Sequence, residues 1–143
     1  MKRSLQSVGV GVAVVASVLL SSTSADAAAI SGKGKAYYGC TNTVKVWRTG
    51  KTVYANAKQV CTHKMSTQRP SVALSGNNGK TFASKIAGCR KSKSCTTPTV
   101  KVKATKKWTY RASNSGTGSF ISQNGSDSWW PVNSVAHATY KYK

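Results

Sequence analysis

Few side chains in this 143-residue chain could perform catalysis. The two histidines, His63 and His137, could act as general base and general acid beside a lysine, which is the set that a secreted ribonuclease can use. The only acidic residues are Asp26, at the end of an N-terminal export signal, and Asp127. Glycosidase, aspartic protease and two-metal chemistry, which need several carboxylates, are therefore excluded. A Ser-His-Asp triad would have to use Asp127, and no G-x-S-x-G motif is present. We expect a protein that is not an enzyme, with the two-histidine ribonuclease as an alternative.

Residues 1–27 have the three parts of a secretory signal peptide. Lys2 and Arg3 form the basic region, residues 8–20 form an apolar region too short to span a membrane, and residues 25–27 have the small-residue cleavage pattern. Cleavage after residue 27 leaves 116 of the 143 residues, with 20 basic side chains against Asp127 alone and a net charge of +19. We expect a secreted, extracellular protein with no transmembrane segment.

The four cysteines, Cys40, Cys61, Cys89 and Cys95, could bind zinc or form two disulfides. Their separations of 21, 28 and 6 residues include no C-x-x-C pair, so we expect no metal site and no cofactor. An even number of cysteines in a small exported domain indicates disulfides, because the hydrophobic core of such a domain gives only a thin margin of stability.

Residues 40–61 are predicted to form a β-hairpin around Gly50-Lys51, because glycine at the first loop position suits a type II′ turn. In this register Cys40 faces Cys61 in a non-hydrogen-bonded pair, where the Cα atoms come close enough for a disulfide. Alternation along the strands gives the hairpin two faces. The core face holds Val44, Val46, Val53, Ala55, Ala57 and the disulfide, and the other face holds Lys45, Trp47, Tyr54 and Lys58. Trp47 and Tyr54 lie opposite each other, either under a second layer of structure or on an exposed binding face.

Cys89 and Cys95 pair by elimination and close a five-residue loop. We expect a hairpin around this loop, with a second apolar face formed by Phe82, Ile86, Val100 and Val102. The loop-entropy model assigns about 3 kcal/mol of stability to the larger disulfide ring and about 2 kcal/mol to the smaller one. The loop, residues 90–94, is either a charged turn or a rigid, substrate-like loop that inhibits a trypsin-type protease.

Strand-like runs recur every eight to twelve residues, with turn residues between them. No stretch has a convincing helical period. We therefore expect an all-β fold, a small antiparallel β-sandwich or partly open barrel of six to eight strands stapled by two disulfides. This domain occupies residues 37–143, and a flexible N-terminal arm of small residues precedes it at 28–36.

The charge of the exported chain indicates an anionic partner, because +19 on 116 residues opposes compaction. Sixteen of the 20 basic residues are lysines, which favours diffuse attraction over bidentate recognition of bases, so we expect no sequence-specific nucleic-acid binding. Candidate partners are other secreted proteins and anionic envelope polymers such as teichoic acids, lipopolysaccharide or anionic lipid. The alternative is that the lysines only keep the protein soluble.

Aromatic and basic residues near these features are the candidate contacts. Trp129 and Trp130 would either contact a membrane or protein partner or cap the core. The arm would add to a partner's sheet edge or lie in its groove. The full set of candidate partner-binding residues is Ile30, Lys33, Lys35, Tyr37, Tyr38, Lys45, Trp47, Tyr54, Lys58, Arg90, Lys91, Lys93, Trp129 and Trp130.

The chain resembles the small exported adaptor subunits of Streptomyces umbrella toxin particles. The shared features are the export signal, the short arm ahead of Tyr37-Tyr38-Gly39-Cys40, a four-cysteine β domain and the lack of a catalytic set. The resemblance implies an adaptor that joins a lectin-bearing subunit to the repeat ring of a large toxin, with its arm in a degenerate protease-like groove. The lactococcin-type bacteriocins are also similar in size and β content, although the four cysteines and the lysine count depart from their pattern. A stand-alone cationic antimicrobial protein that binds anionic envelopes is the corresponding alternative.

Overall fold

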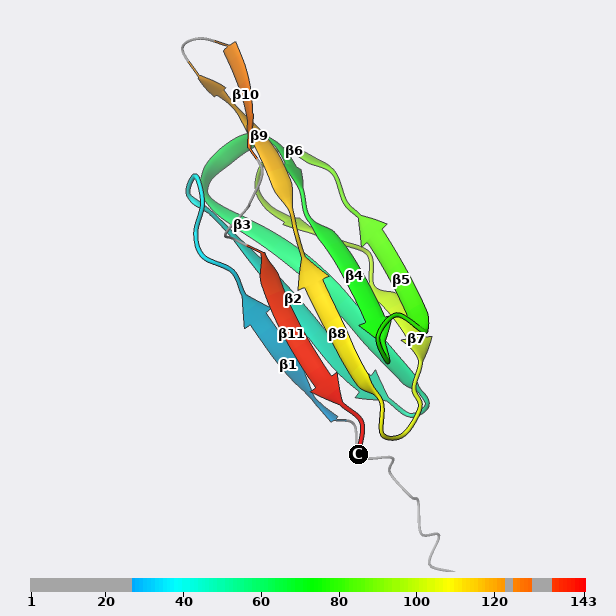
Figure 1. The fold of residues 1–143 in the computed structure, drawn as a ribbon. Coiled ribbons are helices and arrows are strands. Elements are labelled where there is room, and N and C mark those ends of the chain that lie inside the picture. Colours follow the sequence, from blue (N-terminus) through cyan, green and yellow to red (C-terminus); the bar gives the residue numbers. More distant parts are fainter. Residues whose placement is uncertain (1–26, 123–124, 130–134) are drawn as a thin grey trace, which may run out of the picture.

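The computed structural model describes residues 27–122, 125–129 and 135–143, which form eleven antiparallel β-strands in two sheets (Figure 1). The strands are β1 (Ala27–Lys33), β2 (Cys40–Thr49), β3 (Thr52–Arg69), β4 (Ser71–Gly76), β5 (Thr81–Ile86), β6 (Cys89–Thr96), β7 (Val100–Lys103), β8 (Thr109–Asn114), β9 (Thr117–Ser122), β10 (Gly125–Trp129) and β11 (Ala136–Lys141). None of the described residues belongs to a helix long and apolar enough to cross a membrane. The predicted signal peptide lies outside the described residues, except for Ala27.

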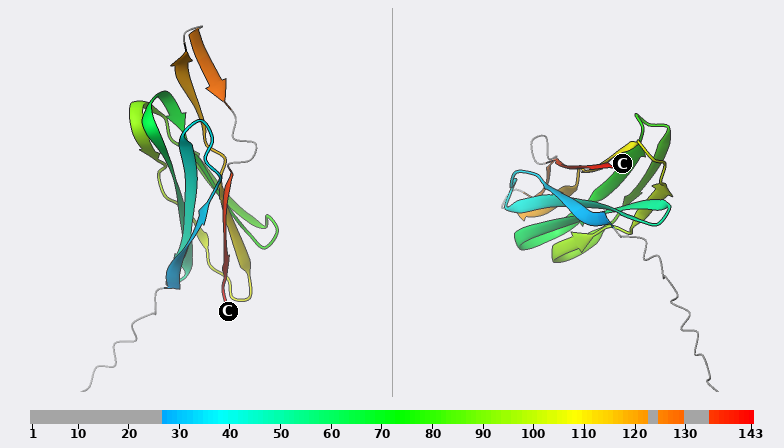
Figure 2. Two further views of the ribbon diagram at one scale, coloured as in Figure 1. Left: turned by 90° about the vertical axis from the view of Figure 1, so that its left-hand side faces the viewer. Right: turned by 90° about the horizontal axis from the view of Figure 1, so that it is seen from below.

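The two sheets pack face to face, as Figure 2 shows from the side and from below. The seven-stranded sheet has the order β1-β2-β3-β9-β10, and β6 and β7 also pair with β3. The four-stranded sheet has the order β11-β8-β4-β5. The predicted all-β sandwich with two disulfides is confirmed. It has more strands than expected because the arm, the disulfide loop and residues 125–129 also pair with neighbouring strands.

Strand β3 organises the seven-stranded sheet because it is 18 residues long and pairs along both of its edges. One edge pairs first with β2 and then, at residues 67–69, with β9. The other edge pairs with β7 at residues 52–55 and with β6 from residue 58 onward. Strands β9 and β10 continue beyond one end of the sandwich (Figure 1).

The β2–β3 hairpin has the predicted register. Cys40 lies opposite Cys61, and their Cα atoms are 3.9 Å apart in a disulfide. Of the two loop residues only Gly50, with φ +56°, has a positive φ, as a type II′ turn requires. The second disulfide, Cys89–Cys95, also forms as predicted. Both disulfides are consistent with an oxidising compartment.

The core between the sheets consists of small and β-branched side chains and two tyrosines. Each fully buried valine or leucine contributes about 1.5–3 kcal/mol to stability. The predicted core face of the β2–β3 hairpin is confirmed, since all of its apolar residues are buried. The core residues are Val44, Val46, Val53, Ala55, Ala57, Val72, Leu74, Val100, Val102, Tyr110, Ala112, Ala136, Ala138 and Tyr140.

The side-chain amide of Asn114 joins the two sheets. Its nitrogen donates to the carbonyl oxygens of Thr43 and Lys58, at 3.0 and 3.1 Å. Its oxygen accepts from the backbone nitrogens of Ser71 and Gly116, at 3.1 and 3.0 Å. The side chain is fully buried, so these four bonds satisfy an amide that would otherwise be costly to bury.

The arm at residues 28–36 is not flexible over its first part, so that prediction was wrong for residues 28–33. These residues belong to β1, which pairs with β2 from Ala27↔Arg48 to Lys33↔Thr43. Composition was misleading because the backbone ladder, and not apolar side chains, orders an edge strand. Small residues also allow a close approach to β11: a Cβ atom added to Gly32 would lie 1.7 Å from the carbonyl oxygen of His137.

The predicted apolar face shared by Phe82, Ile86, Val100 and Val102 was also wrong. Strand β5 pairs with β4 in the four-stranded sheet, whereas β6 and β7 pair with β3 in the other sheet. Phe82 and Ile86 therefore lie on an outer side and are 64% and 70% exposed. The chain changes sheets between β5 and β6, and the Cys89–Cys95 disulfide closes a loop within β6 instead of joining two hairpin strands.

Replacing Gly32 with alanine tests the contact between β1 and β11. We expect Gly32→Ala to lower the free energy of unfolding by about 1–3 kcal/mol, because the added methyl group overlaps backbone atoms that cannot rotate away. Gly88→Ala is the control, since a Cβ atom there meets no atom within 4 Å and φ is not positive. Urea denaturation measures both variants. Equal stability of the two would contradict the proposed close approach.

Candidate anion-binding face

The outer side of the seven-stranded sheet carries lysines in four consecutive cross-strand rows. Residues paired across antiparallel strands point to the same side of the sheet, so the register assigns each row its members. The rows cross β3 at every second residue, from Thr52 to Lys58. The row through Thr52 contains Lys103, and the next row contains Lys101. The third row contains Lys45, and the fourth contains both Lys58 and Lys33. We define these five exposed lysines, with Trp47 and Tyr54, as the basic face.

The charge of the basic face is not balanced within its own strands. No acidic residue occurs in the sequences of β1, β2, β3, β6 or β7, all of which the structure describes. The guanidinium of Arg48, in contrast, has a structural role. Its Nε donates to the hydroxyl of Tyr140 at 3.1 Å, and its central carbon lies 4.4 Å from the ring centre of Tyr142. The cations of the basic face are therefore all lysines.

Trp47 and Tyr54 form the predicted cross-strand pair at the centre of the basic face. Their ring centres are 5.7 Å apart and their planes differ by 15°, so the rings are stacked on each other. Both side chains are half-buried on the outer side of their sheet. The four-stranded sheet packs against the opposite, inner side, so it does not cover this pair (Figure 2).

Two shallow hollows lie beside the lysines and share Thr43. The smaller, of about 150 Å³, is lined by Thr43, Lys45, Asn56, Lys58 and Thr96. The larger, of about 530 Å³, is lined by Lys33, Gly39, Thr41, Thr43, Val60, Cys61 and Thr62. Ammonium, amide and hydroxyl groups in the smaller hollow can donate hydrogen bonds to a bound anion, and such charge-assisted bonds are stronger than neutral ones.

Strand β8 holds both ends of the lysine rows from behind. At one end, the side chain of Asn114 donates to the carbonyl oxygens of Lys58 and Thr43. These two residues belong to the same row as Lys33. At the other end the buried hydroxyl of Tyr110 donates to the carbonyl oxygen of Lys103 at 3.1 Å and accepts from the nitrogen of Thr105 at 2.7 Å. The four-stranded sheet therefore fixes the backbone that presents the lysines.

Lys33 is the only predicted contact residue of the N-terminal arm that lies on the basic face. Ile30 pairs with Val46, which places it on the inner side of the sheet, and it is 39% exposed. Lys35 follows β1 and is exposed. Tyr37 and Tyr38 belong to a tight turn between β1 and β2 that brings Tyr37 opposite Cys40, and their ring centres are 4.7 Å apart.

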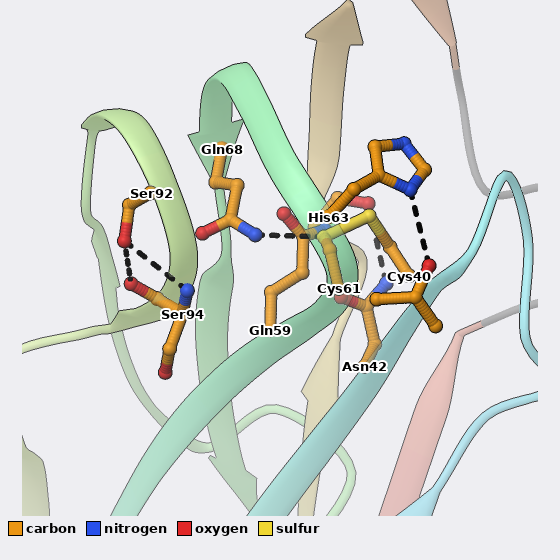
Figure 3. Close-up of a disulfide and its surroundings, with 10 residues drawn as sticks. Cys40, Asn42, Gln59, Cys61, His63, Gln68, Ser92 and Ser94 are labelled. Carbon is orange, nitrogen blue, oxygen red and sulfur yellow. Dashed lines mark hydrogen bonds between the residues drawn. A yellow bond between two sulfur atoms is a disulfide. The ribbon is translucent and has the colours of Figure 1, made fainter.

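The basic loop at residues 90–94 lies on β6, beyond the end of the rows. Arg90, Lys91 and Lys93 are exposed, and the loop is closed by the hydroxyl of Ser92, which donates to the carbonyl of Ser94 at 2.7 Å (Figure 3). Arg90 pairs with β3, and Lys91 has φ +49°, which is not the extended backbone of a protease substrate. This geometry does not favour the inhibitor alternative.

The Cys40–Cys61 disulfide lies in a small cluster of its own, with Met65 buried beside it. The amide nitrogen of Gln68 points at the Cys61 sulfur, 2.7 Å away (Figure 3). All four cysteines are in disulfides and none is left to bind a metal ion. Within the described part of the chain there is no group of three or more His, Cys, Asp or Glu side chains suited to a metal ion.

The two histidines lie on different sheets. His63 is on β3, with its Nδ1 atom 3.1 Å from the hydroxyl of Thr62 (Figure 3). His137 is on β11, where its neighbours Ala136 and Ala138 face the core, so His137 points to the outer side of the four-stranded sheet. This placement does not favour a ribonuclease site that needs both imidazoles at one phosphate.

Trp129 is the last residue of β10, and Trp130 lies outside the described residues.

Sequence reasoning missed Lys101 and Lys103, together with the residues Thr43, Asn56 and Thr96 that line the smaller hollow. The alternation Val100-Lys101-Val102-Lys103 predicts a strand with lysines on one side. It does not reveal that this strand pairs with β3 beside Tyr54. Asn114 and Tyr110 gave no local signal, because their partners are distant in the sequence.

Comparisons of the chain with protein-family models, with curated proteins and with solved structures found no match. The basic face is therefore interpreted from its own chemistry.

Replacing Asn114 tests whether β8 positions the basic face. We expect Asn114→Ala to lower the free energy of unfolding by about 3–5 kcal/mol, because it removes a hydrogen bond from each of four buried or partly buried backbone groups. Asn56→Ala, on the outer side, is the control and should change stability by less than about 0.5 kcal/mol. Thermal and urea unfolding measure both. A small effect of Asn114→Ala would show that packing alone aligns the sheets.

Proposed function

We propose that this protein is an exported, non-enzymatic binding module that holds a polyanionic partner on its basic face. The observation that carries the proposal is the set of four consecutive lysine rows around the stacked Trp47–Tyr54 pair. A surface of one charge sign attracts anions and raises their local concentration. Because a paired sheet already fixes the backbone, binding loses little conformational freedom.

Export is supported by two independent features. Residues 1–27 have the composition of a signal peptide, and all four cysteines are in disulfides, which persist in oxidising compartments. An extracellular location leaves two main classes of polyanionic partner, acidic proteins and envelope polymers.

Within this function we propose an adaptor role in an extracellular antibacterial assembly, as the resemblance to umbrella toxin adaptors implies. An adaptor needs two contact surfaces, and the two outer sides of this sandwich differ in chemistry. The four-stranded side exposes Phe82 and Ile86. Ile86 also lines a hollow of about 450 Å³ together with Arg69, Ser71, Ala87, Gly88, Ser115 and Thr117. Exposed apolar side chains beside a hollow are typical of protein contacts.

A stand-alone cationic antimicrobial protein is the second candidate. It is favoured by the basic face itself, because lysines around an aromatic pair would suffice to hold an anionic envelope without any other subunit.

The double variant Lys45→Gln, Lys101→Gln tests the basic face. We expect it to bind immobilised heparin about 10–30-fold more weakly than the wild-type protein, because each lysine near an anionic surface contributes about 1 kcal/mol. The matched control is Lys80→Gln, Lys85→Gln, which removes the same charge from strand β5 and the turn before it, in the four-stranded sheet. Surface plasmon resonance at several salt concentrations measures all three proteins. An equal loss in both variants would mean that net charge alone determines binding.

Purification of the tagged protein from culture medium tests the adaptor role. We expect larger exported subunits in a fixed ratio, and we expect Phe82→Ser, Ile86→Ser to lose one of them because its apolar contact is removed. Val60→Ser is the control, since Val60 is an exposed apolar residue of the other sheet. A protein that purifies alone and permeabilises target cells by itself, with activity falling as salt rises, would instead support the stand-alone candidate.

A further inference from the structure

We propose that the ligand of the basic face is an extended polyol phosphate chain, a polymer in which phosphodiester groups alternate with short carbon segments. This inference rests on the proposed function, because it assigns a ligand class to the same face. It is carried by the spacing of the rows, by the hollow between Lys45 and Lys58, and by the stacking of the aromatic pair.

The spacing of the lysine rows matches a phosphodiester repeat. Consecutive rows are two residues apart along β3, so they are separated by about 6.6–6.8 Å in that direction. Within the rows the lysines are on different strands: Lys103 and Lys101 on β7, Lys45 on β2, Lys58 on β3 and Lys33 on β1, so their long side chains reach a chain along β3 from both of its edges. Three backbone bonds of an extended polypeptide span about 3.3–3.6 Å, so a repeat with six bonds between phosphorus atoms spans about 7 Å. One phosphate can therefore lie at each row, and four rows hold four repeats over about 20 Å.

The smaller hollow provides a defined position for one phosphate. Lys45 and Lys58 come from neighbouring rows and neighbouring strands, and the hollow of about 150 Å³ lies between them. Asn56 and Thr96 can add neutral donors. The hydroxyl of Thr43 donates to the carbonyl oxygen of Lys58 at 3.2 Å, so it supports the strand pair instead of serving as a free donor.

The aromatic pair favours a polyol over a nucleic acid as the segment between phosphates. Proteins that bind single-stranded nucleic acid stack successive bases on separate aromatic side chains. Trp47 and Tyr54 are stacked on each other at 5.7 Å, so no base can insert between them and they present one combined apolar surface. Such a surface suits the C–H groups of a short carbon segment. The cations of this face are lysines, which attract phosphates without reading bases.

The experiment compares anionic chains of equal charge that differ either in the spacing of the charges or in the group between them. Glycerol phosphate oligomers of two, four and eight repeats, oligothymidylate of the same lengths and oligoglutamate of the same charge are titrated into the disulfide-bonded protein by isothermal calorimetry. We expect affinity for glycerol phosphate to rise by about tenfold or more between two and four repeats, because two more lysine rows are engaged, and to change little between four and eight. We expect the four-repeat oligomer to bind more tightly than either of the other tetramers. Lys45→Gln, Lys101→Gln should lose about tenfold or more in affinity, and Lys80→Gln, Lys85→Gln should stay within about twofold.

Each other outcome has a distinct meaning. Tighter binding of oligothymidylate would overturn the polyol assignment in favour of single-stranded nucleic acid. Equal binding of oligoglutamate, with the Lys45 and Lys101 variant still impaired, would overturn the phosphodiester assignment but leave the proposed anion-binding function intact. Wild-type affinity of that variant for every chain would overturn both. Amide chemical-shift changes in a ¹⁵N-labelled protein must also fall on the four rows, and changes confined to β5 and β11 would place the ligand elsewhere.

Discussion

The buried amide of Asn114 is the interaction on which the arrangement of the two sheets depends. It uses both donors and both acceptor positions, and each partner belongs to a different segment: β2, β3, the start of β4 and the link between β8 and β9. An amide is the side chain that can do this, because an ionised carboxylate has no proton to donate and an apolar group could bind none of the four backbone groups. Since the cost of an unpaired buried group is large, this one contact strongly favours a single relative position of the two layers.

That constraint explains how a protein with so much charge can present it in an ordered way. The lysines of the basic face stand on strands whose inner sides are packed against the core, and their backbone is held at one end by Asn114 and at the other by Tyr110. Repulsion among the ammonium groups is therefore opposed by the disulfides and the packed core, which hold the sheet together. The four cysteines all serve as cross-links, and the two histidines lie on separate sheets.

The β2–β3 hairpin, its disulfide and its two faces could be predicted from the sequence because they depend on local rules. A two-residue turn fixes the register, and alternation then sorts Val46 from Trp47 and brings Cys40 to Cys61. The predictions that were wrong involve strands that are not connected by a tight turn. Residues 27–33 pair with β2 through backbone groups, which composition does not report. Phe82 and Val102 belong to different sheets, although a short disulfide loop near them suggested a shared hairpin.

By itself the sequence determined the charge, the predominance of lysine, the strand-forming pattern and the pairing of the cysteines. Only the tertiary structure decided that β7 lies beside β3 and β1 beside β2, and hence that lysines as distant in the chain as Lys33 and Lys103 lie in successive rows on one face. The physical reason is the range of the forces involved. Turn geometry and side-chain alternation act within a few residues, whereas the neighbours of a strand are selected by the packing of the whole core, to which every segment contributes at once.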